Sequence, residues 1–238
     1  MIKLVYCLRR LPQLSLEEFQ SHWLEHHSHF GFLVKSIRRY VQYHAPHDDP
    51  SRAEAARKQL EPYDGVAIAW FDDVAGMQAA LKSAESAAAV EDERLFIDHS
   101  RSSVCLTREE VLVAPQGKVP YVFFRCYRRR SDIDRRTFSE RWLQQKEKVV
   151  RAHEAGLLMG YIQNHTVLEN DQLGTGSLGQ DGPWDGVLTA YFDSIIKFKV
   201  FLCSTLAQEM FAQERAFTDH SRSIDILTRR YVIKDLIR

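Results

Sequence analysis

The chain carries the same series of short motifs twice, and this internal repeat constrains its fold more than any other feature. The segment IDHSRS at 97–102 recurs as TDHSRS at 218–223, and YDGV at 63–66 recurs as WDGV at 184–187, both at an offset of 121. Further blocks recur in the same order at offsets of 119 or 121, among them CLRR and the Tyr-x-Gln-x-His pattern. Self-similarity at a nearly fixed period marks a repeat architecture, so the sequence predicts a tandem duplication.

Each copy has the pattern of a small α+β unit. Alternating or continuous apolar residues predict four strands in the first copy, over 2–8, 39–44, 65–71 and 104–113. A capping box formed by Ser15 and Glu18 predicts the start of a first helix, and two more helices are predicted over 73–83 and 86–96. The resulting order, βαββαβ, is that of the ferredoxin-like unit.

The predicted fold class is therefore α+β, with two ferredoxin-like repeats packed as a pseudo-dimeric α/β barrel. One such unit has helices on only one face of its sheet, and the other face needs a partner. Because the second copy belongs to the same chain, we expect two sheets packed face to face. The polar junction at 116–118 divides the chain into a first half, residues 1–116, and a second half, residues 117–238.

Composition limits the class of protein. The formal net charge is zero and the pI is near 7.2, so the sequence has no basic footprint for nucleic acid or for a membrane surface. No apolar run approaches the roughly 18–20 residues that cross a bilayer. The four cysteines lack the spacing of a disulfide framework or a zinc site, and no secretory signal is evident, so we expect a cytoplasmic protein.

The first predicted helix carries one histidine that is expected to face the core. His27 follows Trp23 by four residues, on the same apolar stripe. A histidine beside an aromatic wall can titrate near neutrality and act as an acid or a base. The alternative is a histidine at the edge of the core that is satisfied by a backbone carbonyl.

Three other histidines of this helix, His22, His26 and His29, share a different face at a spacing that could bind zinc. The second copy has arginine, glutamine and lysine at the equivalent positions, and the helix offers no further ligand. We therefore predict no metal site, and a solvated face instead.

The second predicted strand presents a polar row. Tyr40, Gln42 and His44 share one face of the strand, and the second half repeats the row with Tyr161, Gln163 and His165. Buried hydrogen-bonding side chains need partners, so the row indicates either a polar ligand pocket or an exposed strand. Both interpretations remain open.

The pairs Asp98-His99 and Asp219-His220 stand just before the last strand of each half. A carboxylate and an imidazole can divide acid–base work, whereas the structural alternative is an aspartate that caps a turn. Arg9 follows the first strand and could hold an anionic group, although a solvated arginine is the simpler interpretation.

Taken in order, the motifs resemble the EthD family of dimeric α/β-barrel proteins, once in each half. The matching patterns are Phe19-x-x-x-Trp23-x-x-x-His27, Tyr40-Val-Gln-x-His44, Tyr63-Asp-Gly-Val and Phe96-x-Asp98. The resemblance implies ferredoxin-like units paired into a barrel, used without a cofactor by cyclases, dehydratases, decarboxylases and isomerases of aromatic or polyketide-like compounds. It predicts the fold better than the substrate.

The resemblance also implies which residues to examine. The helix histidine of the family falls on His27, and the strand histidine falls on His44 and His165. Lys146 replaces the helix histidine in the second half, so we expect one dominant site, in the first half. The predicted catalytic residues are His27, His44, Asp98, His99 and Tyr40. The predicted substrate-binding residues are Trp23, Gln42, Trp70, Arg9, His165, Asp219 and His220.

The leading functional hypothesis is a cofactor-independent lyase or isomerase that acts on a small, hydrophobic, oxygenated molecule. A non-catalytic protein that binds a hydrophobic metabolite, or a stress-associated protein, is the alternative from another class. A haem-binding barrel is a third hypothesis, since other branches of the superfamily bind haem through a histidine. As partners we expect a small-molecule substrate and possible homodimerisation of the fused pair, but neither nucleic acid nor membrane.

Overall fold

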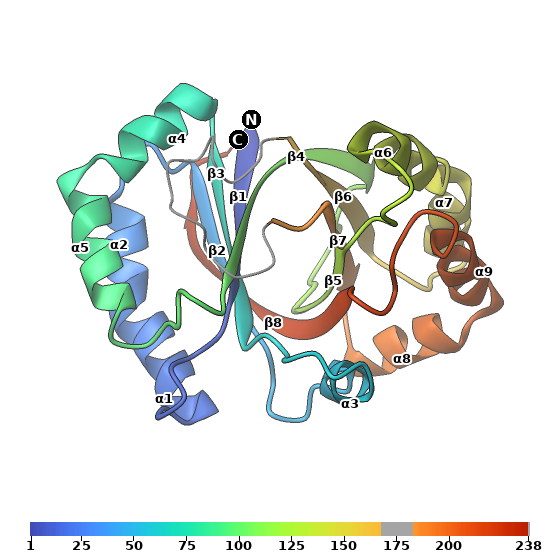
Figure 1. The fold of residues 1–238 in the computed structure, drawn as a ribbon, viewed down its shortest axis with the longest axis horizontal. Coiled ribbons are helices and arrows are strands. Elements are labelled where there is room, and N and C mark those ends of the chain that lie inside the picture. Colours follow the sequence, from blue (N-terminus) through green and yellow to red (C-terminus); the bar gives the residue numbers. More distant parts are fainter. Residues whose placement is uncertain (168–182, 238) are drawn as a thin grey trace.

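Antiparallel strands close into a single barrel at the centre of the molecule (Figure 1). The computed structural model describes residues 1–167 and 183–237. Within them the first half contributes β1 (Ile2–Leu8), β2 (Arg39–His44), β3 (Gly65–Phe71) and β4 (Ser103–Val113). The second half contributes β5 (Tyr121–Tyr127), β6 (Gly160–Thr166), β7 (Gly186–Phe192) and β8 (Ile224–Asp235).

The strand order around the barrel is β1-β3-β2-β8-β5-β7-β6-β4. The long strands β4 and β8 close the barrel, because each changes partner along its length. β4 pairs with β1 through residues 103–107 and with β6 through residues 107–113. β8 pairs with β5 and then with β2 in the same way.

The predicted fold class, two ferredoxin-like repeats with separate sheets packed face to face as a pseudo-dimeric α/β barrel, is therefore wrong. β2 and β6, which would be open edges of two sheets, are hydrogen bonded to the long strand of the opposite half. Unpaired strand edges leave backbone groups without partners, and closure into one barrel removes them. The division at residue 116 stays a prediction.

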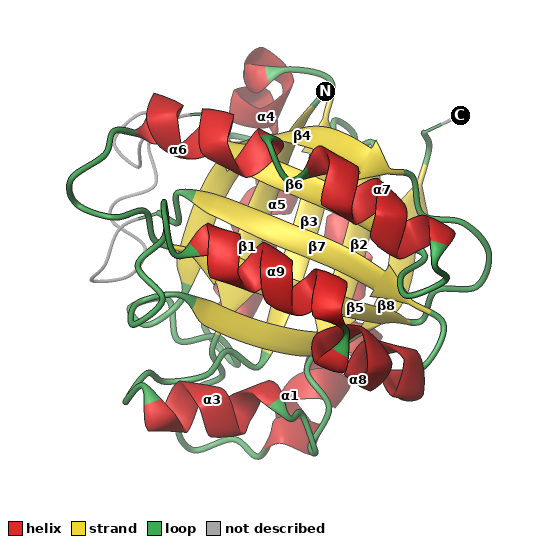
Figure 2. Cartoon of the chain, turned by 90° about the vertical axis from the view of Figure 1, so that its right-hand side faces the viewer, coloured by secondary structure: helices red, strands yellow, loops and turns green. Residues whose placement is uncertain are grey.

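Helices cover opposite sides of the barrel (Figure 1). The helical segments of the first half are α1 (Leu16–Ser21), the π-helix η1 (His22–His27), α2 (Ser28–Leu33), α3 (Ser51–Arg57), α4 (Val74–Leu81) and α5 (Ala84–Glu93). Those of the second half are α6 (Arg135–Leu143), α7 (Lys146–Glu154), α8 (Ile195–Cys203) and α9 (Thr205–Glu214). Figure 2 shows α6, α7 and α9 lying across the strands of the second half, with α3 below them.

The core has three parts, which follow from the alternation of side chains along each strand. One apolar cluster fills the barrel interior, and each half has a second cluster between the outer face of the barrel and its helices. The equivalent cysteines Cys7 and Cys126 meet inside the barrel, with 3.7 Å between their sulfur atoms. Side chains on the outer face of a strand therefore face the helices, and those on the inner face meet side chains from the other half.

Local sequence accounts for most element boundaries. Ser15 and Glu18 form the predicted capping box at the start of α1. The long polar connection 46–62 contains α3, which lies below the barrel in Figure 1. Its predicted counterpart, 166–183, lies almost entirely outside the described residues.

No helix in the described part of the chain is long and apolar enough to cross a membrane.

Candidate active site

Ionisable side chains from β1, η1, the end of α5 and the turn before β4 gather between β1 and the helices. They form what we call the Glu93 cluster: Tyr6, His22, His27, Asp92, Glu93 and His99. β1 supplies the tyrosine, η1 supplies two histidines and the end of α5 supplies the two carboxyl groups. The cluster unites His27 and His99, two of the predicted catalytic residues, around acidic residues that the sequence analysis did not single out.

The π-helix η1 explains how His22 and His27 reach the same carboxylate. Five residues apart on an α-helix, two side chains point about 140° away from each other. Hydrogen bonds in a π-helix run from residue i to i+5, so residues at this spacing share a face. Asp92 accordingly accepts from His22 Nε2 at 3.0 Å and from His27 Nδ1 at 2.8 Å.

Asp92 orients His27 for proton transfer. A carboxylate that accepts at Nδ1 holds the neutral imidazole in the tautomer with its proton on Nδ1. The lone pair on Nε2 then faces Glu93 Oε1, 3.8 Å away. Burial lowers the pKa of His27, and the hydrogen bond to Asp92 opposes this shift. His27 is therefore neutral near pH 7 and able to accept a proton.

Glu93 is held in its protonated form. Burial and the neighbouring charge of Asp92 raise the pKa of its carboxyl group to about 8. Within the described residues it has no lysine or arginine partner, and its nearest ionisable contacts are the imidazoles of His27 and His99. A carboxylic acid that keeps its proton at neutral pH can serve as a general acid.

His99 and Tyr6 complete the cluster on the side of β1. The Tyr6 hydroxyl lies 2.9 Å from His99 Nδ1, and His99 Nε2 lies 3.6 Å from Glu93 Oε2. Burial raises the pKa of Tyr6, so the phenol stays protonated, and burial lowers the pKa of His99. A neutral His99 that accepts from Tyr6 carries its own proton on Nε2, where it faces Glu93.

The equivalent carboxyl group of the second half has a different environment. Glu214 corresponds to Glu93 at an offset of 121, and it is fully buried. Arg125, which replaces Tyr6, donates to Glu214 at 2.9 Å and also binds Asp225, while Tyr127 donates to Glu214 at 2.6 Å. An arginine contact of this kind favours the carboxylate and occupies its oxygens. Burial raises the pKa of Glu214 as it does that of Glu93, but Arg125 opposes this shift. The second half therefore has a buried ion pair where the first half has a carboxyl group with no cationic partner among the described residues.

The polar row of β2 faces the helices and binds protein groups. Gln42 donates to the Trp23 carbonyl at 2.9 Å, and its own carbonyl lies 3.0 Å from His44 Nε2. Tyr40 accepts a hydrogen bond from the Trp23 indole at 3.3 Å. The His44 ring stacks on Trp23 with 4.3 Å between centroids. Burial raises the pKa of Tyr40 to about 12 and lowers that of His44 to about 3.

The second half repeats this arrangement. Gln163 donates to the Trp142 carbonyl at 2.9 Å and lies 3.1 Å from His165 Nε2. Burial lowers the pKa of His165 to about 4. Because both halves use the same contacts to hold the first helix on the sheet, the row has a structural role in each half. Such weakly basic histidines are poor proton acceptors at neutral pH.

The two members of the pair Asp98-His99 point to different partners. Asp98 accepts from the Ser100 backbone and hydroxyl and from the Arg101 guanidinium, as an aspartate in a tight turn does. Asp219 makes the same turn contacts with Ser221. His99 alone joins the Glu93 cluster.

The remaining predicted binding residues lie elsewhere. Trp70 is buried in the barrel interior, 4.9 Å from the Lys3 ammonium group. Arg9 stacks on Tyr63 at the end of the barrel, with 4.0 Å between its guanidinium carbon and the ring centroid. His220 lines a separate cavity between α3 and α8.

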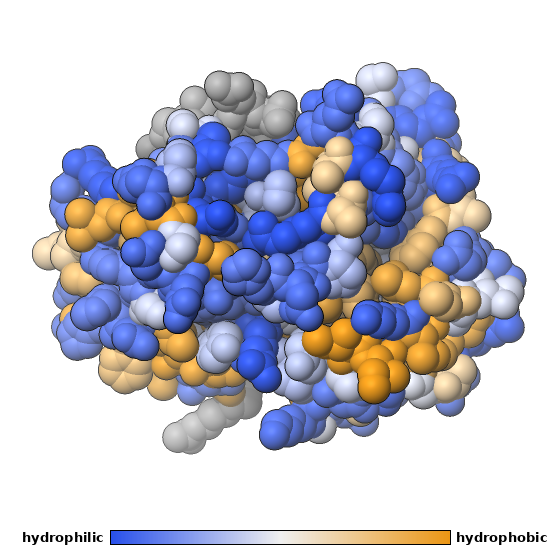
Figure 3. Space-filling view, turned by 90° about the horizontal axis from the view of Figure 1, so that it is seen from below, coloured by the Kyte–Doolittle hydropathy of each residue, from blue (hydrophilic) through white to orange (hydrophobic). Residues whose placement is uncertain are grey.

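The cavity between α3 and α8 has a volume of about 630 Å³ and is lined by side chains of α3, α8, α9 and β5. Phe123, Phe198 and Phe211 supply apolar lining, and burial followed by the nearby Arg125 charge lowers the pKa of His220 to about 4. Figure 3 shows the lower face of the molecule, which is largely hydrophilic at its centre and has an apolar patch on the side of α8. The cavity can therefore accept a small apolar molecule.

Haem does not fit this cavity well. An axial ligand needs an accessible imidazole nitrogen, whereas His220 Nε2 is buried against protein atoms and has no hydrogen-bond partner among the described residues. Within residues 1–167 and 183–237, no group of three or more histidine, cysteine, aspartate or glutamate side chains is arranged to hold a metal ion.

One known domain family matches the part of the chain that contains most of the Glu93 cluster. Residues 11–100 match the EthD domain. This part of the chain is therefore similar to the EthD domain. The EthD segment contains η1, α5 and His99, and thus every member of the Glu93 cluster except Tyr6. No curated protein matches the chain.

Solved structures share the fold over almost the whole chain. An anthrone oxidase-like protein has a TM-score of 0.65 at 9% identity, over 99% of this chain and 94% of its own. A putative monooxygenase from Lactobacillus acidophilus has a TM-score of 0.55 at 10% identity, with coverage of 99% and 96%. A heme-binding protein from Thermus thermophilus has a TM-score of 0.51 at 11% identity, with coverage of 96% and 90%. At such identities the likeness concerns the fold alone.

Three members of the cluster, Tyr6, Asp92 and Glu93, were missed in the sequence. A signal for one of them was present, because Glu93 and Glu214 correspond at the offset of the repeat. A second signal was the difference between the halves at one position of the first strand, where Tyr6 in the first half corresponds to Arg125 in the second. Neither signal reveals contact, since the residues are more than 80 positions apart and only the packing of α5 on β1 joins them.

Proposed function

We propose that the EthD half is an acid–base enzyme of the lyase or isomerase type, with Glu93 and His27 as its proton-transferring residues. The observation that supports this proposal is the position of Glu93 between two imidazoles, without a cation and with a pKa of about 8. Perturbed acids and bases with a specific partner are typical of catalytic sites. The second half, where Arg125 neutralises Glu214, serves as an internal comparison.

In the proposed reaction, His27 Nε2 takes a proton from carbon next to a carbonyl group of the substrate. The electron pair moves to the carbonyl oxygen, which accepts hydrogen bonds from protonated Glu93 and from His99 Nε2 as it gains charge. Return of the proton to another carbon completes an isomerisation, and departure of a neighbouring hydroxyl with the Glu93 proton completes a dehydration. A small oxygenated aromatic or polyketide-like molecule suits this chemistry.

The side chains of the cluster differ in exposure, and this indicates where a substrate would enter. The side chain of His27 is 7% exposed, that of Glu93 17% and that of His99 29%. Phe96, which is fully buried, packs against His27 with 5.1 Å between ring centroids. The side chain of His22 is 28% exposed, so we expect the substrate to approach past His99 or past His22, with Phe96 as an apolar wall.

The first test measures proton exchange in heavy water. Aromatic and polyketide-like carbonyl compounds are incubated with the protein, and the loss of proton signals next to the carbonyl is followed by NMR. Glu93→Gln and His27→Ala should each lower the exchange rate about 100-fold or more, as expected when a general acid or base is lost. The control Lys146→Ala changes the exposed residue of the second half that corresponds to His27 and should leave the rate unchanged. Wild-type rates in both cluster variants would refute the assignment.

A second measurement needs no substrate. Infrared difference spectra of the free protein should show a protonated carboxyl band that disappears with a midpoint near pH 8 and is missing in Glu93→Gln. Activity that uses Glu93 as an acid should fall over the same range, because its proton is lost as the pH rises through 8. Absence of the band at pH 7 would mean that Glu93 is ionised and cannot act as proposed.

Binding of a hydrophobic metabolite without catalysis is the second candidate function, and the cavity between α3 and α8 favours it. In that case no compound is turned over, and both His27→Ala and His44→Ala retain the affinity of the wild-type protein for a bound ligand. Turnover that is lost in His27→Ala supports the enzyme. Ligand binding without turnover, retained in both variants, supports the binding protein.

A further inference from the structure

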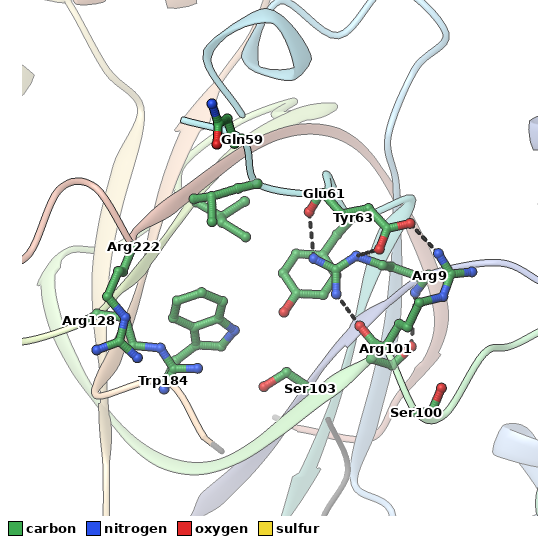
Figure 4. Close-up of a pocket in the computed structure, with 13 residues that line it drawn as sticks. Arg9, Gln59, Glu61, Tyr63, Ser100, Arg101, Ser103, Arg128, Trp184 and Arg222 are labelled. Carbon is green, nitrogen blue, oxygen red and sulfur yellow. Dashed lines mark hydrogen bonds and ion pairs between the residues drawn. The ribbon is translucent and has the colours of Figure 1, made fainter. Parts of the chain in front are cut away.

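A second cavity lies at the end of the barrel and is formed by both halves of the chain (Figure 4). We call it the barrel-mouth cavity. Its volume is about 420 Å³, within the usual range for small-molecule sites. It lies on the inner side of the barrel, whereas Tyr6 of the Glu93 cluster belongs to the layer between β1 and the helices.

The lining of the barrel-mouth cavity is rich in arginine. Arg9 and Arg101 come from the first half, and Arg128 and Arg222 occupy the equivalent positions of the second half. The carboxylate that lines the same cavity is Glu61, which pairs with Arg9 and Arg101. Arg101 also pairs with Asp98, which is not part of the lining. Guanidinium groups still outnumber carboxylates among the described residues at this end of the barrel, which favours an anionic ligand.

Aromatic rings and backbone carbonyls hold two of the arginines in place. Arg9 lies over Tyr63 at 4.0 Å and Arg128 lies over Trp184 at 4.2 Å. Arg9 also donates to the carbonyls of residues 61, 62 and 101. These contacts order the guanidinium groups, but carbonyl oxygens do not cancel their charge.

Two hydrogen-bond donors of the cavity have no partner in the described part of the chain. Trp184 is 3% exposed, and its buried indole Nε1 faces the Tyr63 hydroxyl without forming a hydrogen bond of ordinary geometry. Arg222 is exposed, and its guanidinium group makes no ion pair or hydrogen bond within the described residues. Figure 4 shows the indole nitrogen of Trp184 and the hydroxyl of Tyr63 directed toward the space between them. A ligand oxygen placed between the two rings would give the indole N–H a closer acceptor.

The remaining walls are apolar. Leu60 and Ile224 line the cavity together with the rings of Tyr63 and Trp184. Such walls favour a flat hydrocarbon body over a fully hydrated ion.

We infer that the barrel-mouth cavity binds a small aromatic carboxylate, with its carboxylate accepting from Trp184 Nε1 and Arg222 and its ring against the apolar walls. This site goes beyond the proposed acid–base function, because it uses none of the residues of the Glu93 cluster. It also depends on the duplication, since neither half supplies the whole cavity.

The test is calorimetric titration of the full-length protein with 2-naphthoate. We expect saturable binding of one equivalent, and at least 10-fold weaker binding of the uncharged 2-naphthamide. Arg222→Met removes an exposed charge and Trp184→Phe removes the indole N–H while keeping a ring. Each should weaken 2-naphthoate binding about 10-fold, the effect of losing one charge-assisted hydrogen bond. The control Arg151→Met removes an exposed arginine of α7 that lines neither of the two cavities, and it should leave the affinity unchanged.

Three outcomes would overturn the inference. They are failure of 2-naphthoate to bind, wild-type affinity in both Arg222→Met and Trp184→Phe, and inorganic phosphate binding as tightly as 2-naphthoate. Thermal unfolding followed by circular dichroism checks that each variant is folded, and Arg222→Met is the decisive variant because its side chain is exposed. None of these outcomes bears on Glu93, because binding is measured without turnover.

Discussion

At the scale of single residues, one exchange on the first strand separates the two halves. Tyr6 leaves Glu93 without a cation, whereas Arg125 at the equivalent position binds Glu214 and Asp225. A phenol hydrogen-bonds without adding charge, so burial can keep Glu93 protonated. An arginine favours the ionised carboxylate instead. The two halves share many motifs, but a difference at few positions changes the environment of the equivalent glutamates.

The buried histidines His44 and His165 should make stability depend on pH. Their pKa values are lowered to about 3 and about 4, so the folded protein binds fewer protons than the unfolded chain below pH 6.5. The stabilisation is fully present above pH 6.5 and is lost as the pH falls toward the folded-state values. Between pH 6.5 and 5 we expect roughly 2 kcal/mol less stability per histidine. Urea unfolding across this range, compared with His44→Gln and His165→Gln, checks the slope, and equal slopes in all three proteins would contradict the prediction.

At the scale of elements, the first helical region has a different helix type in the two halves. In the first half η1 joins α1 to α2 as a π-helix, which brings His22 and His27 to Asp92. In the second half α6 ends at Leu143 and α7 begins at Lys146. The same contact to the sheet is kept in both halves, because Gln42 and Gln163 bind the carbonyls of Trp23 and Trp142.

The contact of these tryptophans with β3 and β7 requires glycine. A Cβ atom on Gly65 would lie 2.4 Å from the Trp23 ring, and one on Gly186 would lie 2.5 Å from the Trp142 ring. Gly65→Ala and Gly186→Ala should each destabilise the protein by about 1–3 kcal/mol, the usual effect of overpacking. Gly76→Ala in α4 is the matched control, because its Cβ would meet nothing closer than 3.4 Å. Urea unfolding measures the stability of all three variants. If Gly65→Ala and Gly186→Ala are as stable as Gly76→Ala, the tryptophan rings move aside without cost.

At the scale of the whole molecule, β4 and β8 join the halves into one sheet. Each long strand pairs with its own half first and with the other half afterwards. Closure protects every strand edge and creates the barrel-mouth cavity between equivalent residues of the two halves.

An isolated first half should therefore associate with itself. A fragment of residues 1–116 lacks β6 and β8, so β2 and the outer part of β4 lose their partners. Because β8 is the counterpart of β4, β4 of one fragment can pair with β2 of another. We expect a dimer of the fragment by size-exclusion chromatography with light scattering, measured beside the full chain. A folded, monomeric fragment would show that closure is not needed for stability.

Properties carried by neighbouring residues were determined by the sequence alone. The duplication, the strand boundaries of β1, β2 and β3, the capping box and the EthD resemblance depend on local pattern, which periodicity and spacing report directly. Closure of the barrel, the π-helix and the Glu93 cluster were decided only by the tertiary structure. They depend on which strand edges meet and on how α5 packs against β1, and the free energy of such contacts is set by groups far apart in the chain.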